Sequence, residues 1–235
     1  MPLTDSLNLL RLGLGLLLRP TIQVLNQARL EMTATEALEA ARAHDFQALS
    51  HAKFSVPADQ LEARAFWLNL YNALTLHAIH AAQIRDSMLE SLGFYAKFAY
   101  VVAGQPTTLS EIEHGVLRAN QAVLLGNKPL PPTDPRAAWV LPLDARIHFA
   151  LNCGAVSCPP IRAYQAAQLE AQLEFATQSY LQECRIENGI LLVPRLFSYY
   201  PKDFGDVSGF IRRYRPDLTA FSKIRYLPYS WLLTK

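Results

Sequence analysis

The sequence predicts a helix-rich α+β protein, with one domain that contains a small β-sheet and an apolar helical arm in front of it. Three observations support this fold class. Apolar residues recur at helical spacing in three segments, 33–49, 65–84 and 168–183. Two short β-prone runs occupy residues 98–102 and 190–193. The composition, with 51% apolar and 18% charged residues among 235, is typical of a globular chain.

The predicted helices carry recognisable start signals. Thr33 or Thr35 can cap the first of them, because a hydroxyl accepts a hydrogen bond from a free amide of the first turn. Residues 65–84 give the clearest helix, and the rest of the chain adds a short one at 210–214. Ser110 and Glu113 match a capping box, which predicts a further helix from Ser110 onward.

A third strand is expected at residues 147–151, where Ile147, Phe149 and Leu151 alternate with His148, Ala150 and Asn152. Alternation would place His148 and Asn152 on one face of this strand. The segment 120–144 holds five prolines and one glycine, which predicts a long loop. Such a loop could also act as a lid over a site. No internal repeat interrupts the chain. We therefore place the arm at residues 1–32 and a single domain at 33–235.

The arm contains an apolar stretch at residues 7–18, interrupted by Arg11 and ended by Pro20. It lacks the basic start and the cleavage site of a signal peptide, and it is shorter than the roughly 20 apolar residues that span a bilayer. Two interpretations remain: a helix packed on the domain, or an interfacial helix that contacts a membrane peripherally. The expected location is cytoplasmic, with membrane association as the alternative.

Charge and cysteine content restrict the partners. The 22 basic and 20 acidic residues are mixed along the chain and give a net charge of +2, so we expect no nucleic-acid partner. The three arginines at 212, 213 and 215 are interpreted as a solvated face. Three cysteines are too few for a disulfide scaffold, and an odd number leaves at least one thiol unpaired, which favours a reducing compartment.

The segment 148–159 gathers polar and thiol side chains where the predicted strand runs into a glycine-containing loop. Cys153 is the candidate nucleophile there, because a thiol becomes reactive when a base lies within hydrogen-bond reach. Strand alternation places His148 on the face opposite Cys153, which makes His114 the better candidate base. Glu113 is expected to cap its helix rather than to orient His114.

No metal or cofactor is expected. Cys153 and Cys158 lie at the wide limit of zinc-ligand spacing, and a structural site would need a second pair of ligands, to which His148 or His114 could contribute. His77 and His80 are three residues apart, whereas zinc-binding helices typically use four, and no glutamate follows the first histidine.

Three ordered blocks resemble the hallmark blocks of the domain of unknown function 547 family. They are AFWLNLYNALTLH at 65–77, IEHGVLR at 112–118 and RIHFALNCGAVSCP at 146–159. Further similarity at 199–204 and 226–231 extends the resemblance over residues 33–231. The family supplies no established reaction. The resemblance implies one cluster that contains six polar residues: His77, Glu113, His114, Arg146, His148 and Asn152.

Two comparisons with the family's pattern bear on Ser230 and on the cysteine pair. This chain has Ser230 where the family's closing motif usually has an acid, so the resemblance implies no charged role there. Some relatives carry serine in place of the second cysteine, so the resemblance disfavours an obligatory zinc site or disulfide formed by Cys153 and Cys158. Cys153 is then the more important of the two.

Two functions follow as alternatives. The first is a thiol-dependent hydrolase or transferase for a small molecule or peptide, with Cys153 as nucleophile and His114 or His148 as base. Its substrate-binding residues would be Asn69, Asn72, Glu113, Arg146, Asn152 and Cys158, with an asparagine as oxyanion donor and Arg146 for an anionic group. The second is a non-catalytic binding or interaction module, in which the same polar residues form a buried structural network.

Overall fold

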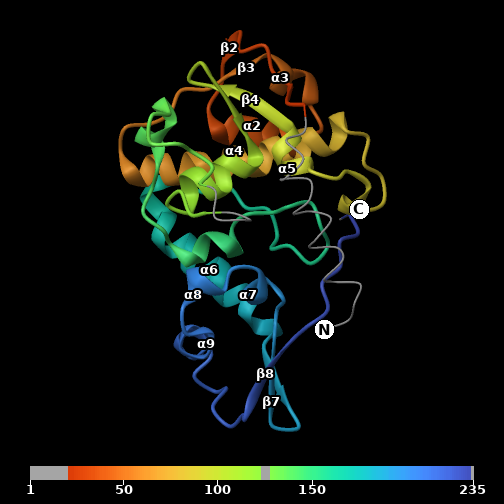
Figure 1. The fold of residues 1–235 in the computed structure, drawn as a ribbon, viewed down its shortest axis with the longest axis vertical. Coiled ribbons are helices and arrows are strands. Elements are labelled where there is room, and N and C mark those ends of the chain that lie inside the picture. The colour runs from red at the N-terminus through yellow and green to blue at the C-terminus, as the bar shows by residue number, and fades with distance from the viewer. Residues whose placement is uncertain (1–20, 123–127, 234–235) are drawn as a thin grey trace.

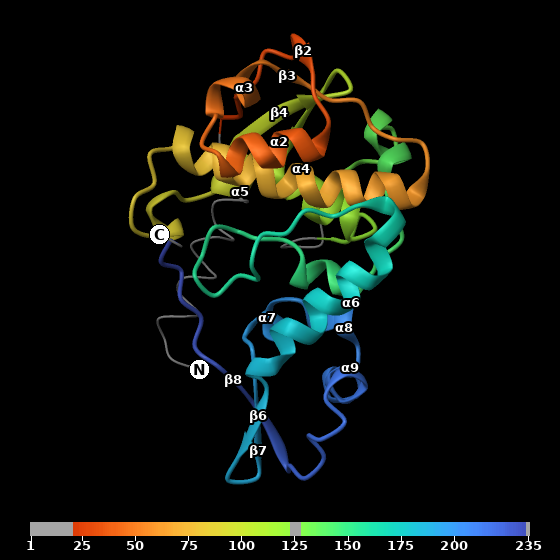
Figure 2. The same cartoon turned by 180° about the vertical axis from the view of Figure 1, so that it is seen from behind.

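The long helix α4 (Gln60–Ala81) is the centre of the fold in the computed structural model, which describes residues 21–122 and 128–233. Helix α2 (Ala34–Arg42) packs along it, and α3 (Phe46–His51) lies beside both (Figures 1 and 2). Within these described ranges, three small β-sheets are distributed around the helices. The protein is therefore a helix-rich α+β protein, as predicted from the sequence.

Helix α4 is buried on nearly all sides because apolar residues cover most of its circumference. Trp67, Leu70 and Leu74 have no exposed surface, and Tyr71 is buried with them. The helix begins at Gln60, five residues before the predicted start at Ala65, because the Asp59 carboxylate accepts hydrogen bonds from the amides of the first turn. This helix is confirmed, with bounds slightly shifted towards the N-terminus.

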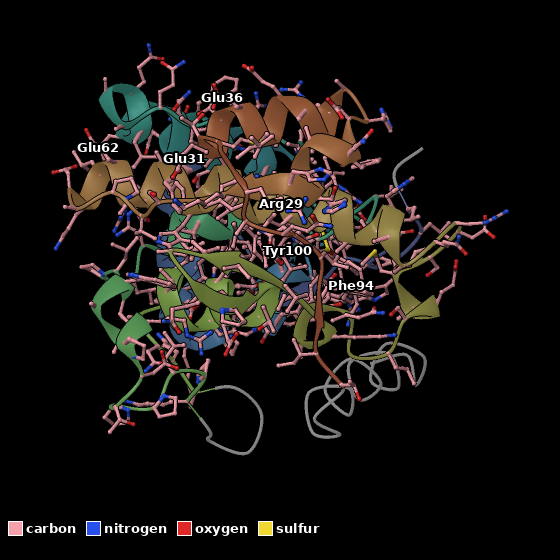
Figure 3. The ribbon with its side chains drawn as sticks, turned by 90° about the horizontal axis from the view of Figure 1, so that it is seen from above. Arg29, Glu31, Glu36, Glu62, Phe94 and Tyr100 are labelled. Carbon is pink, nitrogen blue, oxygen red and sulfur yellow. A yellow bond between two sulfur atoms is a disulfide. The ribbon has the colours of Figure 1, made fainter. Side chains whose placement is uncertain are left out.

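The segment predicted as one helix at 33–49 is two helices, α2 and α3. Thr33 caps α2 in a capping box with Glu36, as its position indicated. His44 adopts a left-handed backbone conformation, with a φ of 60°, which ends the first helix, and Asp45 caps the second. Seen from above, Glu36 and Glu62 lie at the outside of the molecule, whereas Tyr100 lies within it (Figure 3).

The first sheet confirms the strand predicted at 98–102. Strand β4 (Phe98–Val102) pairs antiparallel with β5 (Gln105–Thr108) and parallel with β1 (Gln23–Val24). A two-stranded parallel sheet joins β2 (Leu30–Glu31) and β3 (Ala52–Lys53). The buried Asn26 side chain connects these two sheets, because it accepts from the Val101 amide at 2.7 Å and donates to the Ala52 carbonyl at 2.8 Å.

The C-terminal part of the chain forms a second core. Helix α6 (Leu169–Tyr180) is followed by the turn η7 (Leu181–Glu183) and by a sheet of β6 (Arg185–Glu187), β7 (Ile190–Val193) and β8 (Lys223–Tyr226). Helices α7 (Leu196–Tyr199), α8 (Pro201–Phe204) and α9 (Val207–Tyr214) complete it. Four phenylalanines pack at its centre: Phe149, Phe197, Phe204 and Phe210. The elements predicted at 168–183, 190–193 and 210–214 are confirmed.

Short elements connect these parts. They are η1 (Met88–Glu90), α5 (Phe94–Lys97), η2 (Glu111–Leu117), η4 (Pro135–Trp139), η5 (Ala145–Phe149) and η6 (Ala166–Gln168). Element η2 is a turn of π-helix, in which the Arg118 amide donates to the Glu113 carbonyl at 2.9 Å. Such wide turns rotate the following side chains relative to an α-helix, and this one carries the Glu113–His114 pair.

Two local predictions are wrong. Residues 147–151 do not form a strand: the chain makes a 3₁₀ turn at η5, capped by Asp144, so the alternation argument for His148 does not apply. The capping box lies at Thr108 and Glu111 rather than at Ser110 and Glu113. Because Glu111 performs the capping, Glu113 is free to point into the interior.

Residues 21–32 of the predicted arm are extended rather than helical, since β1 and β2 pair with strands of the main body. The apolar stretch at 7–18 lies outside the described residues, and its contact with a membrane stays a prediction. Within the part of the chain that the structure describes, no helix has both the length and the apolar character needed to cross a bilayer.

Candidate functional site

One cavity of about 450 Å³ brings together residues from several distant segments. Helix α4 contributes Tyr71, η2 contributes Glu113 and His114, and η5 contributes His148. The loop after η5, the segment of α7 and α8, and the C-terminal segment contribute further residues to the wall, among them Cys153, Cys158, Pro159, Tyr199, Tyr200, Lys202, Tyr229 and Trp231. All three residues predicted to be catalytic, Cys153, His114 and His148, line this cavity.

Glu113 is the buried carboxylate of the cavity. Its Oε2 accepts a hydrogen bond from the Tyr71 hydroxyl at 3.0 Å, and its Oε1 accepts from the Tyr200 hydroxyl at 2.7 Å. Burial favours the neutral acid, but neighbouring His114, the Tyr200 hydroxyl and Arg118 outweigh it and keep the pKa of Glu113 below its ordinary value. Glu113 is therefore an anion whose oxygens are both occupied by hydrogen bonds.

Asp203 holds a second group of side chains together. Its carboxylate accepts two hydrogen bonds from Arg118, at 2.6 and 2.9 Å, and one from Nε2 of His148 at 2.8 Å. Burial alone would raise the pKa of Asp203, but the hydrogen bonds from His148 and Arg118 lower it to about 2. The side chains of Asp203, His148 and Arg118 are almost completely buried, so Arg118 and Asp203 form an interior ion pair, to which His148 adds a hydrogen bond.

The surroundings of His148 and His114 determine their protonation states. Burial lowers the pKa of His148 despite the adjacent Asp203, and burial also lowers the pKa of His114 despite Glu113. His148 stacks on the Tyr200 ring with 3.9 Å between ring centroids. Nδ1 of His114 lies 2.7 Å from a guanidinium nitrogen of Arg118. Both imidazoles are consequently neutral near pH 7.

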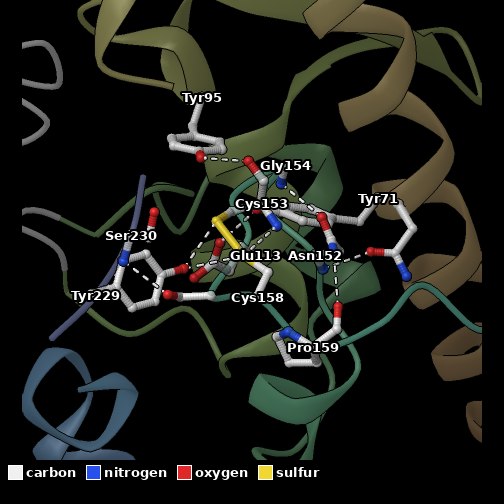
Figure 4. The surroundings of a disulfide bond; sticks show 12 residues. Tyr71, Tyr95, Glu113, Asn152, Cys153, Gly154, Cys158, Pro159, Tyr229 and Ser230 are labelled. Atoms are coloured by element: carbon white, nitrogen blue, oxygen red, sulfur yellow. Dashed lines mark hydrogen bonds between the residues drawn. A yellow bond between two sulfur atoms is a disulfide. The ribbon is translucent and has the colours of Figure 1, made fainter. Parts of the chain in front are cut away.

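Cys153 and Cys158 form a disulfide in the wall of the cavity (Figure 4). The resemblance disfavours an obligatory disulfide between these two cysteines, whereas the structure shows that they are paired in this chain. The two cysteines come together because the loop between them is closed by hydrogen bonds. The Asn152 side chain accepts from the Gly154 amide at 2.7 Å and donates to the Pro159 carbonyl at 2.7 Å, which fixes both ends. The third cysteine, Cys184, is a buried free thiol.

Gly154 lets the cysteine loop approach helix α4. Its φ of 92° lies in the region that favours glycine, and an added Cβ would lie 2.5 Å from the side chain of Ile79. On the other side of the loop, the Tyr95 hydroxyl donates to the Cys153 carbonyl at 3.0 Å. The loop is thus fixed by helix α4, by Tyr95 and by its own asparagine, and its sulfur atoms face the cavity.

Several predicted site residues are placed elsewhere. Asn69 exchanges two hydrogen bonds of 2.8 Å with the backbone of Tyr164, and Asn72 ties helix α4 to the backbone of Ala150 and Asn152. Arg146 pairs with Asp144 and Glu170 away from the cavity wall. His77 contacts the Tyr100 hydroxyl at 3.0 Å. These four polar side chains have structural partners, and they are not among the residues that line the cavity.

Replacing Asn72 by alanine should lower the free energy of unfolding by about 2 kcal/mol, because the buried Asn152 amide and Ala150 carbonyl would lose their partners. Urea titrations followed by circular dichroism would measure the loss. Gln60→Ala, at the exposed first residue of the same helix, is the matched control and should change little. Equal stability of the two variants would contradict the role of Asn72 as a tie.

The structure adds residues that sequence reasoning did not assign to the site. Tyr71 and Arg118 lie inside the blocks that carried the family resemblance, and Tyr200, Asp203 and Tyr229 lie in its two weaker segments. The family resemblance therefore covered these residues, although it did not assign them to the site. Nothing in spacing or composition distinguished these tyrosines and the aspartate from ordinary core and surface residues.

Over residues 21–122 and 128–233, no three histidine, cysteine, aspartate or glutamate side chains are grouped so as to hold a metal ion. The hydrogen bonds of Glu113, His114 and Asp203 instead go to tyrosine, arginine and histidine side chains.

The fold and the site together define the class of this protein. It is a helix-rich α+β protein with a polar cavity, and the cavity is lined by the Glu113–His114 turn, by the cysteine loop and by Tyr229 near the C-terminus. The model of the family described as "Protein of unknown function, DUF547" matches residues 57–181, so the chain belongs to this family. The match spans helix α4, the π-helical turn and the cysteine loop. Neither the curated proteins nor the solved structures include a match to the chain.

Proposed function

We propose that the chain, with Cys153 and Cys158 reduced, is a thiol-dependent hydrolase or transferase that acts on a small molecule in the cavity. The observation that carries the proposal is that Cys153, His114 and His148 line the same cavity of about 450 Å³. A cavity of this size accepts a small organic molecule, and its wall combines aromatic surface with a few polar groups. Cys153 is the nucleophile.

His148 is the general base in this proposal. Its Nε2 faces the Asp203 carboxylate at 2.8 Å, so Nε2 carries the hydrogen and Nδ1 keeps a lone pair for the proton of a thiol. The lowered pKa of His148, caused by its burial, keeps the ring neutral and able to accept that proton near pH 7. Asp203 orients the ring, and Arg118 in turn holds Asp203.

His114 has a different role because of its tautomer. A guanidinium is always a donor, so the 2.7 Å contact from Arg118 requires a lone pair on Nδ1 of His114. The remaining hydrogen of the neutral ring is then on Nε2. His114 is consequently a hydrogen-bond donor, suited to an oxygen that becomes negatively charged during reaction, and not the base.

The reaction would proceed in two balanced stages. The Cys153 thiol gives its proton to Nδ1 of His148 as its sulfur forms a bond to an acyl carbon, and His148 passes this proton to the departing group when the old bond breaks. Water or another acceptor then loses a proton to His148 and attacks the thioester, which releases the product, and His148 returns this proton to the departing Cys153 thiolate. His114 stabilises the oxyanion of each stage.

The test uses the Cys158→Ser variant, in which Cys153 and the buried Cys184 are the only cysteines. The rate of Cys153 alkylation by iodoacetamide should rise with pH around a midpoint below the ordinary thiol value of about 8.5. Adding His148→Gln should raise this midpoint, whereas His80→Gln, outside the cavity, should not. A midpoint at or above the ordinary value, unaffected by His148, would exclude a base-activated Cys153.

A non-catalytic binding module is the second candidate, and the buried network of Glu113, Arg118 and Asp203 favours it. Such networks also fix the packing of segments without any chemistry. In this case Cys153→Ala would leave the affinity for a ligand found by screening unchanged. Loss of turnover in a folded Cys153→Ala protein would support the enzyme instead.

A further inference from the structure

The disulfide differs from ordinary structural disulfides in its surroundings. Both sulfur-bearing residues, Cys153 and Cys158, line the cavity and are only partly buried. Cys184, by contrast, is buried in the second core, and burial raises the pKa of its thiol to about 12. A compound that enters the cavity can therefore reach the disulfide, whereas it cannot reach the remaining thiol.

The Tyr229 hydroxyl lies against both sulfur atoms, at 3.3 Å from Cys153 and 3.1 Å from Cys158 (Figure 4). Burial raises the pKa of Tyr229 well above its ordinary value, so the phenol keeps its hydrogen and can donate it. The Cys153 amide also donates to the sulfur of Cys158, at 3.1 Å. The sulfur of Cys158 thus has two hydrogen-bond donors, and the sulfur of Cys153 has one of them.

These contacts matter because hydrogen-bond donors stabilise a thiolate. In thiol–disulfide exchange, the sulfur that leaves more easily is the one whose thiolate is better stabilised. Cys158 is therefore the better leaving group. The sulfur of Cys153 is the one that an incoming thiolate attacks.

We propose that Cys153 and Cys158 are a redox-active pair that oxidises low-molecular-weight thiols in the cavity, with Tyr229 as the hydrogen-bond donor to the departing sulfur. This activity goes beyond the proposed hydrolase or transferase and does not depend on it. Where both hold, the disulfide form blocks the nucleophile, and a thiol entering the cavity releases it.

The exchange balances in two steps. A thiolate RS⁻ attacks the sulfur of Cys153, the sulfur–sulfur bond breaks, and Cys158 leaves as a thiolate that accepts a hydrogen bond from Tyr229. The product is a mixed disulfide on Cys153. A second thiolate attacks the R sulfur, so that RSSR leaves and Cys153 becomes a thiolate. Both protein thiolates take protons from water, and two thiols have been oxidised as one protein disulfide is reduced.

The first experiment measures the rate at which 2-mercaptoethanol reduces the native, full-length chain near neutral pH. Samples are quenched with acid, alkylated and analysed by mass spectrometry. Tyr229→Phe removes only the hydroxyl and should slow reduction about tenfold, the effect of losing one hydrogen bond to a charged group. Tyr226→Phe, in β8 and outside the cavity wall, is the matched control and should reduce at the rate of the wild type.

The second experiment locates the mixed disulfide in the unmodified chain. A short exposure to the thiol, acid quenching and peptide mapping should find the adduct on Cys153. An adduct chiefly on Cys158, an unchanged rate in Tyr229→Phe, or reduction only after denaturation would each overturn the proposal. Because no acyl substrate is involved, these results are independent of the alkylation test of the hydrolase or transferase.

Discussion

Replacing Asp203 by asparagine should lower the free energy of unfolding by about 3 kcal/mol, because the change removes the carboxylate that pairs directly with the buried Arg118 guanidinium. In the wild type, the Asp203 carboxylate accepts hydrogen bonds from Arg118 and from His148. An amide keeps the shape but turns one acceptor into a donor, which would face the donors of Arg118 or His148. Urea titration near neutral pH would measure the loss.

The chain contains a matched control for this prediction. Asp217 accepts the same pair of hydrogen bonds from Arg215, at 2.9 and 2.7 Å, but its side chain is exposed to solvent. Asp217→Asn should therefore cost little, since water replaces the lost partner. Similar losses in the two variants would show that burial does not decide the contribution of the Asp203 ion pair.

The second large effect is loss of stability in acid caused by His77. Burial, together with neighbouring His80, lowers the pKa of His77 from 6.5 to about 4. The unfolded chain therefore binds a proton at His77 before the folded chain does. The free energy of unfolding should fall as the pH drops from about 6.5 to about 4, by about 2 kcal/mol after allowance for partial exposure, and this contribution should stay constant below that range.

His77→Gln should remove this part of the pH dependence. The difference between the unfolding free energies at about pH 7 and about pH 4 should shrink by about 2 kcal/mol relative to the wild type. Buried His114 and His148, whose pKa values are also lowered, would still contribute to the remaining dependence. A His77→Gln profile parallel to that of the wild type would contradict the prediction.

The elements that could be predicted are those whose signal is local. Helix α4 follows from apolar residues at helical spacing, and strands β4 and β7 follow from short β-prone runs. The same reasoning failed at η5, because residues 147–151 are all buried, so the alternation of residue types there does not separate a buried face from an exposed one. At Ser110 a correct motif was assigned to the wrong pair, since Thr108 and Glu111 have the same spacing.

Only part of the candidate site could be predicted, because the sequence shows residue types and not their partners. Cys153, His114 and His148 were selected because reactive residue types occur in motif blocks, and the structure brings them to one cavity. Asn69 and Asn72 occur in the same blocks, yet their side chains serve the backbone. Residue type and spacing do not distinguish an amide that binds a ligand from one that ties two segments together, because both need the same donors and acceptors.

The sequence by itself determined the fold class, the main helices and strands, the presence of a cysteine without a partner, and the importance of segment 148–159. Only the tertiary structure decided the partners of that segment. Asp203 lies 55 residues from His148 and 85 from Arg118, and Tyr200 lies 87 from Glu113. The physical reason is that periodicity and capping act over a few residues, whereas these contacts exist only after the C-terminal helices have packed against η2 and η5.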